Sequence, residues 1–185
     1  MSLKINYLNK LNYKIKGNFV FFLSKNYKFD QILKSSTKLD INKIAKNILS
    51  KNSKESAFYS YDLNVDQKII FIQLGQKLLN KDYEQLGAKF FDHIKKNKYN
   101  LINILGTSFK ENPKSLEYFI HGIHLKSYEF NIYKTKNKPN NHIINIYNNN
   151  NSKETKLKRS QLSSLAEGTF YCRDLVSEPG NILHP

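Results

Sequence analysis

The chain has one cysteine and no long apolar run. Because Cys172 is the only cysteine among 185 residues, no disulfide can form within the chain, and nothing points to an oxidising compartment. The apolar run Phe19–Leu23 is far shorter than the roughly 20 residues that cross a bilayer, and residues 1–6 lack the apolar core of a signal peptide. By elimination, we expect a cytoplasmic protein that does not contact a membrane.

Arginine is scarce, although the formal net charge is +15. Arg159 and Arg173 are the only arginines, and the other 28 basic residues are lysines. Clustered cations bind nucleic acid without regard to sequence, but paired hydrogen bonds to bases favour arginine. Asn, Ile, Tyr and Phe are also frequent, as an AT-rich coding sequence would produce. The lysines therefore favour a solvated surface, and a basic face that binds nucleic acid or nucleotide stays open as an alternative.

The length and composition predict a folded α/β protein. A chain of this size fits one ordinary domain with an appendage, and such a domain buries roughly two-thirds of its unfolded surface. Hydrophobic residues make up 39% of the chain, with twelve Tyr and twelve Phe, more than a disordered chain would carry. Strand and helix patterns alternate along most of it, which favours a layered α/β domain.

The first third of the chain predicts a hairpin and a helix. Two short β-prone runs, residues 4–8 and 19–23, flank Lys16-Gly17-Asn18, so we expect them to pair as a hairpin. Apolar residues at helical spacing follow Asp40, which we expect to cap a helix over residues 41–49.

The middle of the chain predicts strand, helix, strand and helix. Residues 68–75 form a nearly continuous apolar run, typical of a central strand buried on both faces. Asp82 and Gln85 resemble a capping box at the start of a helix. A second buried strand is expected over residues 99–105, and Pro113 begins the next helix. This order implies parallel strands joined by right-handed crossovers.

The end of the chain predicts a last strand, a linker and a long helix. The strand covers residues 142–147, and the run of Asn from 148 to 151 with Ser152 is the expected linker. We therefore expect an α/β domain over residues 1–150, and a linker helix with the start of another domain over residues 151–185. The predicted apolar stripe of this helix consists of Leu162, Leu165, Ala166, Thr169, Cys172 and Val176.

None of the potential sites in the chain carries a complete pattern. His121 and His124 can share one face of a helix, but two histidines are an incomplete metal site, and we expect them to be surface or half-buried residues. Gly106-Thr107-Ser108 follows a strand and offers backbone amides to a phosphate, yet it lacks a full glycine-rich motif. We expect Cys172 to pack inertly in its helix. No residue is therefore assigned a catalytic, cofactor-binding or metal-binding role.

The last thirteen residues, 173–185, read Arg-Asp-Leu-Val-Ser-Glu-Pro-Gly-Asn-Ile-Leu-His-Pro. This run resembles the segment that opens the catalytic domain in the leucyl aminopeptidase family, Ala-Arg-Asp-Leu-Val-Asn-x-Pro-x-Asn-x-Leu-x-Pro. Cys172 stands where Ala is usual, Ser177 replaces Asn, Glu178 precedes the Pro, and His184 replaces the common Thr. These departures leave the subfamily and its substrate preference open.

A second run, Gly122–Thr135, is similar to the family's N-terminal domains, in which a helix end leads to Leu-x-x-Tyr-x-Phe-x-x-Tyr-Lys. We expect Leu125, Tyr128 and Phe130 to be packing anchors that hold the end of a helix. The two matches lie in the family's order, and with the α/β segment from residue 68 the resemblance covers roughly the last 120 residues.

The resemblance implies a macro-domain-like fold, a mixed sheet flanked by helices and followed by a linker helix. It also implies that the intact protein is a cytosolic metallopeptidase, a hydrolase that removes N-terminal amino acids from peptides with two divalent ions, zinc or manganese, and assembles as a hexamer. The family holds these ions in a Gly-Lys-Gly segment and an Asn-Thr-Asp-Ala-Glu-Gly-Arg segment, and neither string occurs in this chain. We therefore expect a non-catalytic N-terminal domain that is inactive by itself. A freestanding interaction domain whose final helix docks on a partner is a further possibility.

Overall fold

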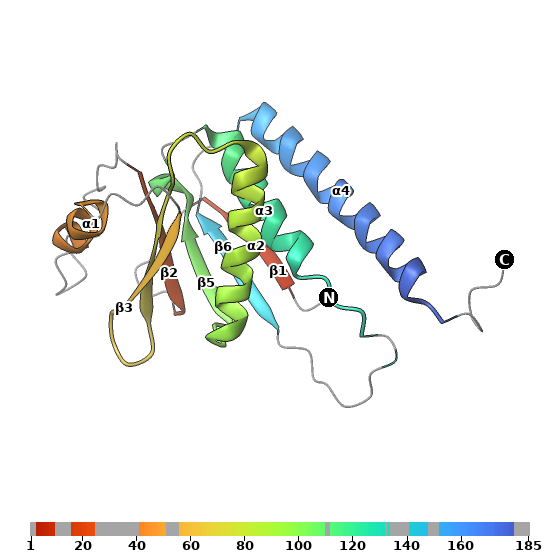
Figure 1. The fold of residues 1–185 in the computed structure, drawn as a ribbon, viewed down its shortest axis with the longest axis horizontal. Coiled ribbons are helices and arrows are strands. Elements are labelled where there is room, and N and C mark those ends of the chain that lie inside the picture. The colour runs from red at the N-terminus through yellow and green to blue at the C-terminus, as the bar shows by residue number, and fades with distance from the viewer. Residues whose placement is uncertain are drawn as a thin grey trace.

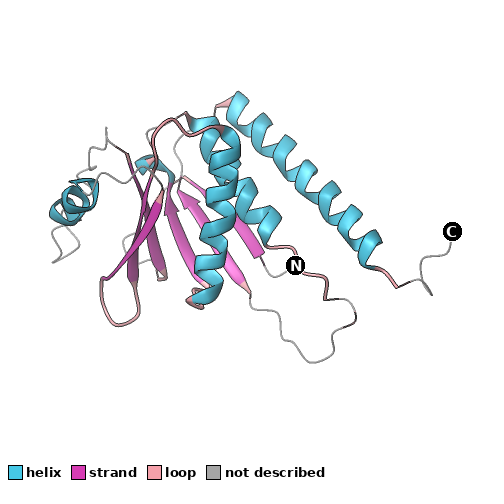
Figure 2. Cartoon of the chain, viewed as in Figure 1, coloured by secondary structure: helices cyan, strands magenta, loops and turns pink. Residues whose placement is uncertain are grey.

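The computed structural model describes residues 3–9, 16–24, 41–50, 56–109, 112–131, 133, 141–147 and 152–179. In these residues a six-stranded sheet has the order β1-β6-β5-β2-β4-β3. Helices α2 and α3 cover one face, α1 lies against the other, and α4 runs alongside α3 (Figures 1 and 2). The predicted α/β fold class, a mixed sheet flanked by helices, is confirmed. The elements are β1 Leu3–Leu8, β2 Asn18–Leu23, α1 Ile41–Ser50, β3 Ala57–Asp62, β4 Lys68–Gln73, α2 Asn80–Lys96, β5 Leu101–Leu105, a 3-10 turn η2 Gly106–Ser108, α3 Pro113–Lys126, β6 His142–Tyr147 and α4 Lys153–Ser177.

The predicted hairpin between the first two strands is wrong. β1 pairs in parallel with β6 at one edge of the sheet, whereas β2 lies between β4 and β5 and is parallel to both. The physical reason lies in β2 itself, because its side chains from Val20 to Leu23 are buried on both faces, which only an interior strand provides. Gly17 precedes β2 with a φ of 94°, and this bend leads the chain into the middle of the sheet.

The expected parallel arrangement of β4, β5 and β6 is confirmed through their shared neighbours. β4 is buried on both faces but is second from the edge rather than central, because β3 pairs antiparallel with it. The sequence analysis missed β3, although Ala57–Asp62 carries three aromatic residues and leads through a short turn into β4.

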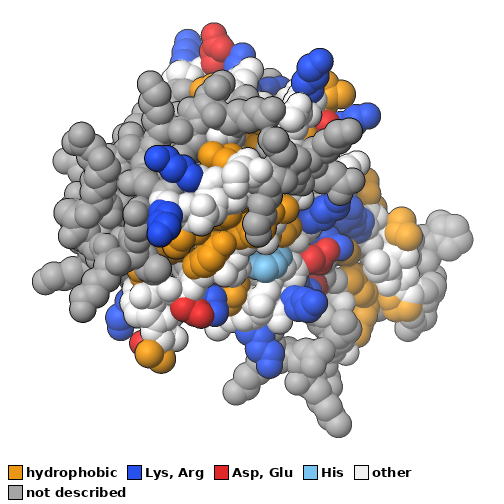
Figure 3. Space-filling model, turned by 60° about the vertical axis from the view of Figure 1, so that its left-hand side comes forward, with side chains coloured by type: hydrophobic (Ala, Val, Ile, Leu, Met, Phe, Trp, Pro, Cys, Tyr) orange, Lys and Arg blue, Asp and Glu red, His pale blue; other side chains and the backbone are white. Residues whose placement is uncertain are grey.

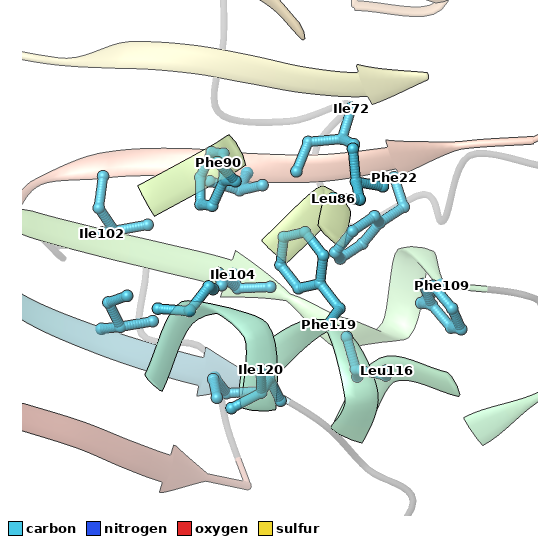
Figure 4. Packing of buried hydrophobic residues seen from close by; sticks show 14 of the residues in the cluster. Phe22, Ile72, Leu86, Phe90, Ile102, Ile104, Phe109, Leu116, Phe119 and Ile120 are labelled. Carbon is cyan, nitrogen blue, oxygen red and sulfur yellow. The ribbon is translucent and has the colours of Figure 1, made fainter. Parts of the chain in front are cut away.

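The main core lies between the sheet and the pair α2 and α3. The ring of Phe22 on β2 meets Phe119 on α3 edge-on, with ring centroids 5.1 Å apart, and it meets Phe109 at the same distance. Phe90 of α2 packs against Phe119 as well, at 5.7 Å. Figure 4 shows these rings among the aliphatic side chains of β4, β5 and α3. Edge-on aromatic pairs of this kind add to the area that the core buries.

Two glycines let α2 and α3 approach closely. A Cβ on Gly87 of α2 would lie 1.9 Å from the Phe119 carbonyl oxygen, and one on Gly122 of α3 would lie 1.9 Å from the Glu84 carbonyl oxygen. Each glycine therefore faces the backbone of the opposite helix, and no larger residue fits without separating the helices.

The helix starts were predicted with mixed success. Pro113 opens α3 as expected, with the Asn112 side chain accepting from the Lys114 amide at 3.0 Å. α2 begins at Asn80, so Asp82 is its third residue and not its cap; the Asp82 carboxylate accepts from the Leu79 amide at 2.8 Å. Asp40, the predicted cap of α1, lies outside the described residues.

Candidate functional site

Helix α4 lies along α3 through a narrow apolar face. It begins after Ser152, whose hydroxyl accepts from the Thr155 amide at 3.2 Å, and it ends at Ser177, two residues before Pro179. The predicted stripe is right for Leu162 and Ala166. It is wrong for the exposed residues Leu165, Cys172 and Val176. The residues that α4 buries are Thr155, Leu162, Ala166 and Phe170.

The two sequence runs that resemble the family meet in the structure. The Tyr128 hydroxyl donates to the Asp174 carboxylate at 2.8 Å, and the Arg173 guanidinium donates to the Leu125 carbonyl at 3.1 Å. Tyr133 donates in the same way to the Glu178 carboxylate. We call this set of contacts the α3–α4 joint; it ties the end of α3 to the end of α4.

Aromatic packing supports the joint from one side. The Phe170 ring of α4 lies between Tyr128, at 5.3 Å, and His124, which it meets edge-on at 5.1 Å. Desolvation and the bond to Asp174 raise the pKa of Tyr128. The expectation that Tyr128 holds the helix end is confirmed, whereas Phe130 packs on Tyr133 in the segment that follows.

A buried ion pair joins the other end of α4 to α3. The Glu117 side chain, 1% exposed, accepts two bonds from Arg159, at 2.9 Å from Nη2 and 3.2 Å from Nε. The guanidinium lies over the Tyr7 ring of β1, 3.4 Å from its centroid, and the Tyr7 hydroxyl donates to Glu117 at 3.2 Å. Burial, followed by the Glu117 charge, raises the pKa of Tyr7. One carboxylate thus links β1, α3 and α4, and the sequence analysis missed it because Glu117 sits in an otherwise apolar helix.

The structure places His121 and His124 on the face of α3 that meets α4. The His121 side chain is 2% exposed, and its Nε2 lies 3.8 Å from Glu84. Burial lowers the pKa of both histidines, with Glu84 opposing at His121 and Glu167 opposing at His124. In the described part of the chain no group of three or more His, Cys, Asp or Glu gathers as metal ligands would. Both histidines therefore serve the helix contact, and His121 is more buried than expected.

The Gly106–Ser108 segment forms a tight turn whose polar groups are used internally. The Ser108 hydroxyl donates to the Leu105 carbonyl at 2.6 Å and accepts from the Phe22 amide at 2.9 Å. The Gly106 carbonyl accepts from the Phe109 amide at 3.0 Å. Since the Ser108 hydroxyl is occupied and buried, it is not available to bind a phosphate.

Cys172 is exposed on α4 and does not pack as expected. The reason is helical phase: the buried face passes through Ala166 and Phe170, and a residue two positions after Phe170 points away from it. The thiol is thus open to solvent.

The basic residues do not gather on the face shown in Figure 3. The described Lys and Arg side chains there lie in separate places among acidic, hydrophobic and uncharged groups. Several lysines pair with acids on the surface, including Lys95 with Glu129 and Lys126 with Asp92. The described cations on this face therefore do not form a continuous track of the kind that a polyanion needs. Among the described helices, none has the length and apolar character to span a bilayer.

No family model matches the chain. The similar proteins described below are all named aminopeptidases. A probable cytosol aminopeptidase of Treponema denticola is 28% identical over 152 residues, which covers 78% of this chain and 32% of that protein. A probable cytosol aminopeptidase of Rickettsia typhi is 28% identical over 199 residues, with 99% of this chain and 39% of that protein covered.

A solved structure shares the fold. A mutant of tomato leucine aminopeptidase superposes with a TM-score of 0.66 at 19% sequence identity, over 99% of this chain and 40% of that one. The chain thus spans 32 to 40% of the length of these proteins. The resemblance noted in the two sequence runs is confirmed by relatives of the same kind.

Proposed function

We propose that this chain, which is related to the leucyl aminopeptidase family, is the non-catalytic N-terminal domain of an aminopeptidase together with the first residues of its catalytic domain. The observation that carries the proposal is the match of 99% of this chain to 39% of a probable cytosol aminopeptidase. The division is proposed at residue 150, with the α/β domain before it and the linker helix after it.

The α3–α4 joint supports a positioning role for this domain. Arg173 and Asp174 open the run that resembles the start of a catalytic domain, and both are bonded to the end of α3. A segment fixed at two points of a packed helix has little freedom to swing, because it is released only when both bonds are broken. We propose that the joint sets the direction in which the chain enters the catalytic domain.

The described residues do not fit a two-metal hydrolytic site. Such a site needs several carboxylates converging on the ions, and the acidic residues near α3 and α4 are instead engaged singly with Arg159, Tyr128 and Tyr133. We therefore propose that the two divalent ions, zinc or manganese, belong to the part of the enzyme that follows residue 185, and that this chain supplies no ligand to them.

The intact protein is proposed to release N-terminal amino acids from peptides in the cytoplasm, as the names of the relatives suggest, and to assemble as a hexamer, as the resemblance implies. The alternative of a freestanding basic module that binds nucleic acid or nucleotide is not favoured, because the relatives are named aminopeptidases. A freestanding domain whose helix docks elsewhere is not favoured either, since α4 already packs on α3.

The test compares residues 1–185 with the product of the complete gene. Both are assayed for release of leucine from a leucine amide substrate, with Mn²⁺ or Zn²⁺ added. We expect turnover only from the complete protein. Turnover by pure residues 1–185 would contradict the proposed non-catalytic role, and a complete protein without peptidase activity would contradict the proposed family activity.

A further inference from the structure

Helix α4 carries a second apolar face, on the side away from the residues that pack on α3. Its large apolar residues are well exposed: 60% for Leu157 and for Leu165, 37% for Leu175 and 87% for Val176. Because each residue turns a helix by about 100°, these four residues lie within a single arc of roughly 100°. We call this arc the free face of α4; it consists of Leu157, Leu165, Gly168, Cys172, Leu175 and Val176.

A contiguous apolar stripe on one side of a helix differs from scattered exposed leucines, which are ordinary on protein surfaces. The side of α4 that packs within this fold consists of Thr155, Leu162, Ala166 and Phe170. α4 lies at the outside of the molecule, beyond α3 (Figure 1), and the described residues leave the free face open to solvent. A second apolar stripe on such a helix indicates a second neighbour that covers it.

Gly168, in the middle of the free face, packs against nothing in the described structure. Glycine weakens a helix interior, and Gly87 and Gly122 serve close packing, because each faces a backbone carbonyl of the neighbouring helix. A Cβ on Gly168 would instead meet no atom within 4 Å. The space over Gly168 thus admits the close approach of a further backbone.

The α3–α4 joint fixes the direction of the free face. Arg173 and Asp174 bond to the end of α3 from one side of the last two turns of α4, while Cys172, Leu175 and Val176 are exposed on the other side. A surface that is held in place before contact loses little conformational freedom when a neighbour docks. The end of α4 therefore presents a preformed docking surface.

We propose that the free face of α4 is covered, in the complete protein, by the part of the same chain that follows residue 185 and packs back along α4. This inference rests on the proposed function. The relatives are long enough to supply such a part, because this chain spans only 32 to 40% of their length. Among the large apolar residues of the face, exposure is greatest at Val176, and Leu175 and Val176 belong to the run that resembles the start of a catalytic domain.

Covalent attachment favours this occupant over a second copy of the chain. A domain joined by a short linker reaches an effective concentration on the order of millimolar, so its contact with α4 does not depend on how much protein is present. A second copy would cover the free face only as the protein concentration rises. The two occupants therefore differ in a measurable way.

Cys172 reports on this contact directly, because it is exposed on the free face. Its alkylation by iodoacetamide is followed by mass spectrometry, in residues 1–185 and in the complete gene product, over a range of protein concentrations. We expect alkylation about tenfold slower in the complete protein at every concentration, because a packed contact must open before the reagent enters. Equal rates in the two proteins would overturn the proposal. Slower alkylation of residues 1–185 as their concentration rises would assign the face to a second copy and overturn it as well.

Matched variants locate the contact. In the complete protein, Val176→Gln should speed the alkylation of Cys172 about fivefold, because part of the valine burial is lost. In residues 1–185 the same change should leave the rate and the urea midpoint unchanged, since Val176 is exposed there. Val65→Gln changes an exposed valine in the turn between β3 and β4, at the edge of the sheet opposite β1, and should affect neither protein. Equal effects of the two variants on the complete protein would overturn the proposal.

The leucine amide assay separates this inference from the proposed function. An active complete protein whose Cys172 reacts as fast as in residues 1–185 would refute the inference alone. A complete protein with a protected Cys172 but no peptidase activity would refute the family activity alone.

Discussion

The Tyr128 hydroxyl at the end of α3 donates a 2.8 Å hydrogen bond to the Asp174 carboxylate on α4, 46 residues further along the chain. Both residues belong to runs that resemble the leucyl aminopeptidases, and each run looked like an independent signal in the sequence. In the structure the two runs contact each other and together form the α3–α4 joint.

Replacing Tyr128 by Phe should loosen the C-terminal half of α4 without unfolding the sheet. The ring still packs on Phe170, but the Asp174 carboxylate loses its donor. We expect faster amide hydrogen exchange in α4 after Phe170 and earlier proteolytic cleavage near Ser177, with exchange in β2 and β5 unchanged.

Asp174→Asn serves as the partner variant for this prediction. If the two groups act through one bond, the double variant should exchange no faster than the more affected single variant. Additive effects of Tyr128→Phe and Asp174→Asn would show that the joint does not depend on this bond.

Removing Glu117 should destabilise the protein strongly. The Glu117→Ala variant leaves the Arg159 guanidinium without its carboxylate in a largely buried place, and breaking one side of such a pair costs about 3 kcal/mol or more. Urea unfolding measures the free energy of unfolding. Replacing both Glu117 and Arg159 by Leu should cost clearly less than the sum of the single changes, and a loss below about 0.5 kcal/mol for Glu117→Ala would refute the importance of the pair.

The glycines of α2 and α3 should respond oppositely to that of α4. Gly87→Ala and Gly122→Ala each push a Cβ to within 1.9 Å of a backbone carbonyl oxygen, so we expect losses of at least about 2 kcal/mol in unfolding free energy. Gly168→Ala meets no atom within 4 Å and should stabilise α4 by about 0.5–1 kcal/mol. The prediction fails if Gly87→Ala and Gly168→Ala shift the urea midpoint in the same direction.

Stability should fall as the solution is acidified through the titration of the α3 histidines. Burial lowers the pKa values of His121 and His124 in the folded protein, so between these values and about 6.5 the unfolded chain binds more protons. The stabilising effect is complete above about pH 6.5 and is lost as the pH falls through the folded values.

The measurement is the free energy of unfolding between pH 7.5 and pH 5. The double variant His121→Gln, His124→Gln should have a flatter pH dependence than the parent chain. His93, whose pKa burial also lowers, remains in both proteins and supplies the remaining slope. Identical slopes for parent and variant would contradict the prediction.

The sequence predicted where the strands and helices lie better than it predicted which strands pair. Continuous apolar runs located β2 and β4, and Pro113 located the start of α3, because these signals are local. The pairing of β1 with β6 joins residues about 140 positions apart, and no local pattern distinguishes that arrangement from a hairpin. The run Phe19–Leu23 has no polar face to turn toward solvent. This feature indicates an interior strand rather than one strand of a hairpin.

The sequence predicted the burial of the candidate residues poorly, because burial depends on which face of each helix meets a neighbour. His121 and His124 were expected at the surface or half buried, and the structure places both on the α3–α4 contact, with His121 buried. Cys172 was assigned to the buried face because its spacing from Leu165 and Thr169 fits a helix. The true buried face passes through Phe170, a residue that the apolar stripe had left out.

The sequence predicted only one side of the α3–α4 joint. Leu125 and Tyr128 were recognised as anchors, but their partners Arg173 and Asp174 were assigned to a separate segment. Hydrogen bonds between positions 46 and 48 residues apart depend on how α4 returns along α3, and that path is set by the packing of Leu162, Ala166 and Phe170.

The central claim is that this chain is the accessory front part of a two-metal aminopeptidase, and the coding sequence after Pro185 tests it most directly. We predict that the codons continue in frame and encode a Gly-Lys-Gly segment followed by Asn-Thr-Asp-Ala-Glu-Gly-Arg. A stop codon immediately after Pro185, or a continuation without either segment, would contradict the account.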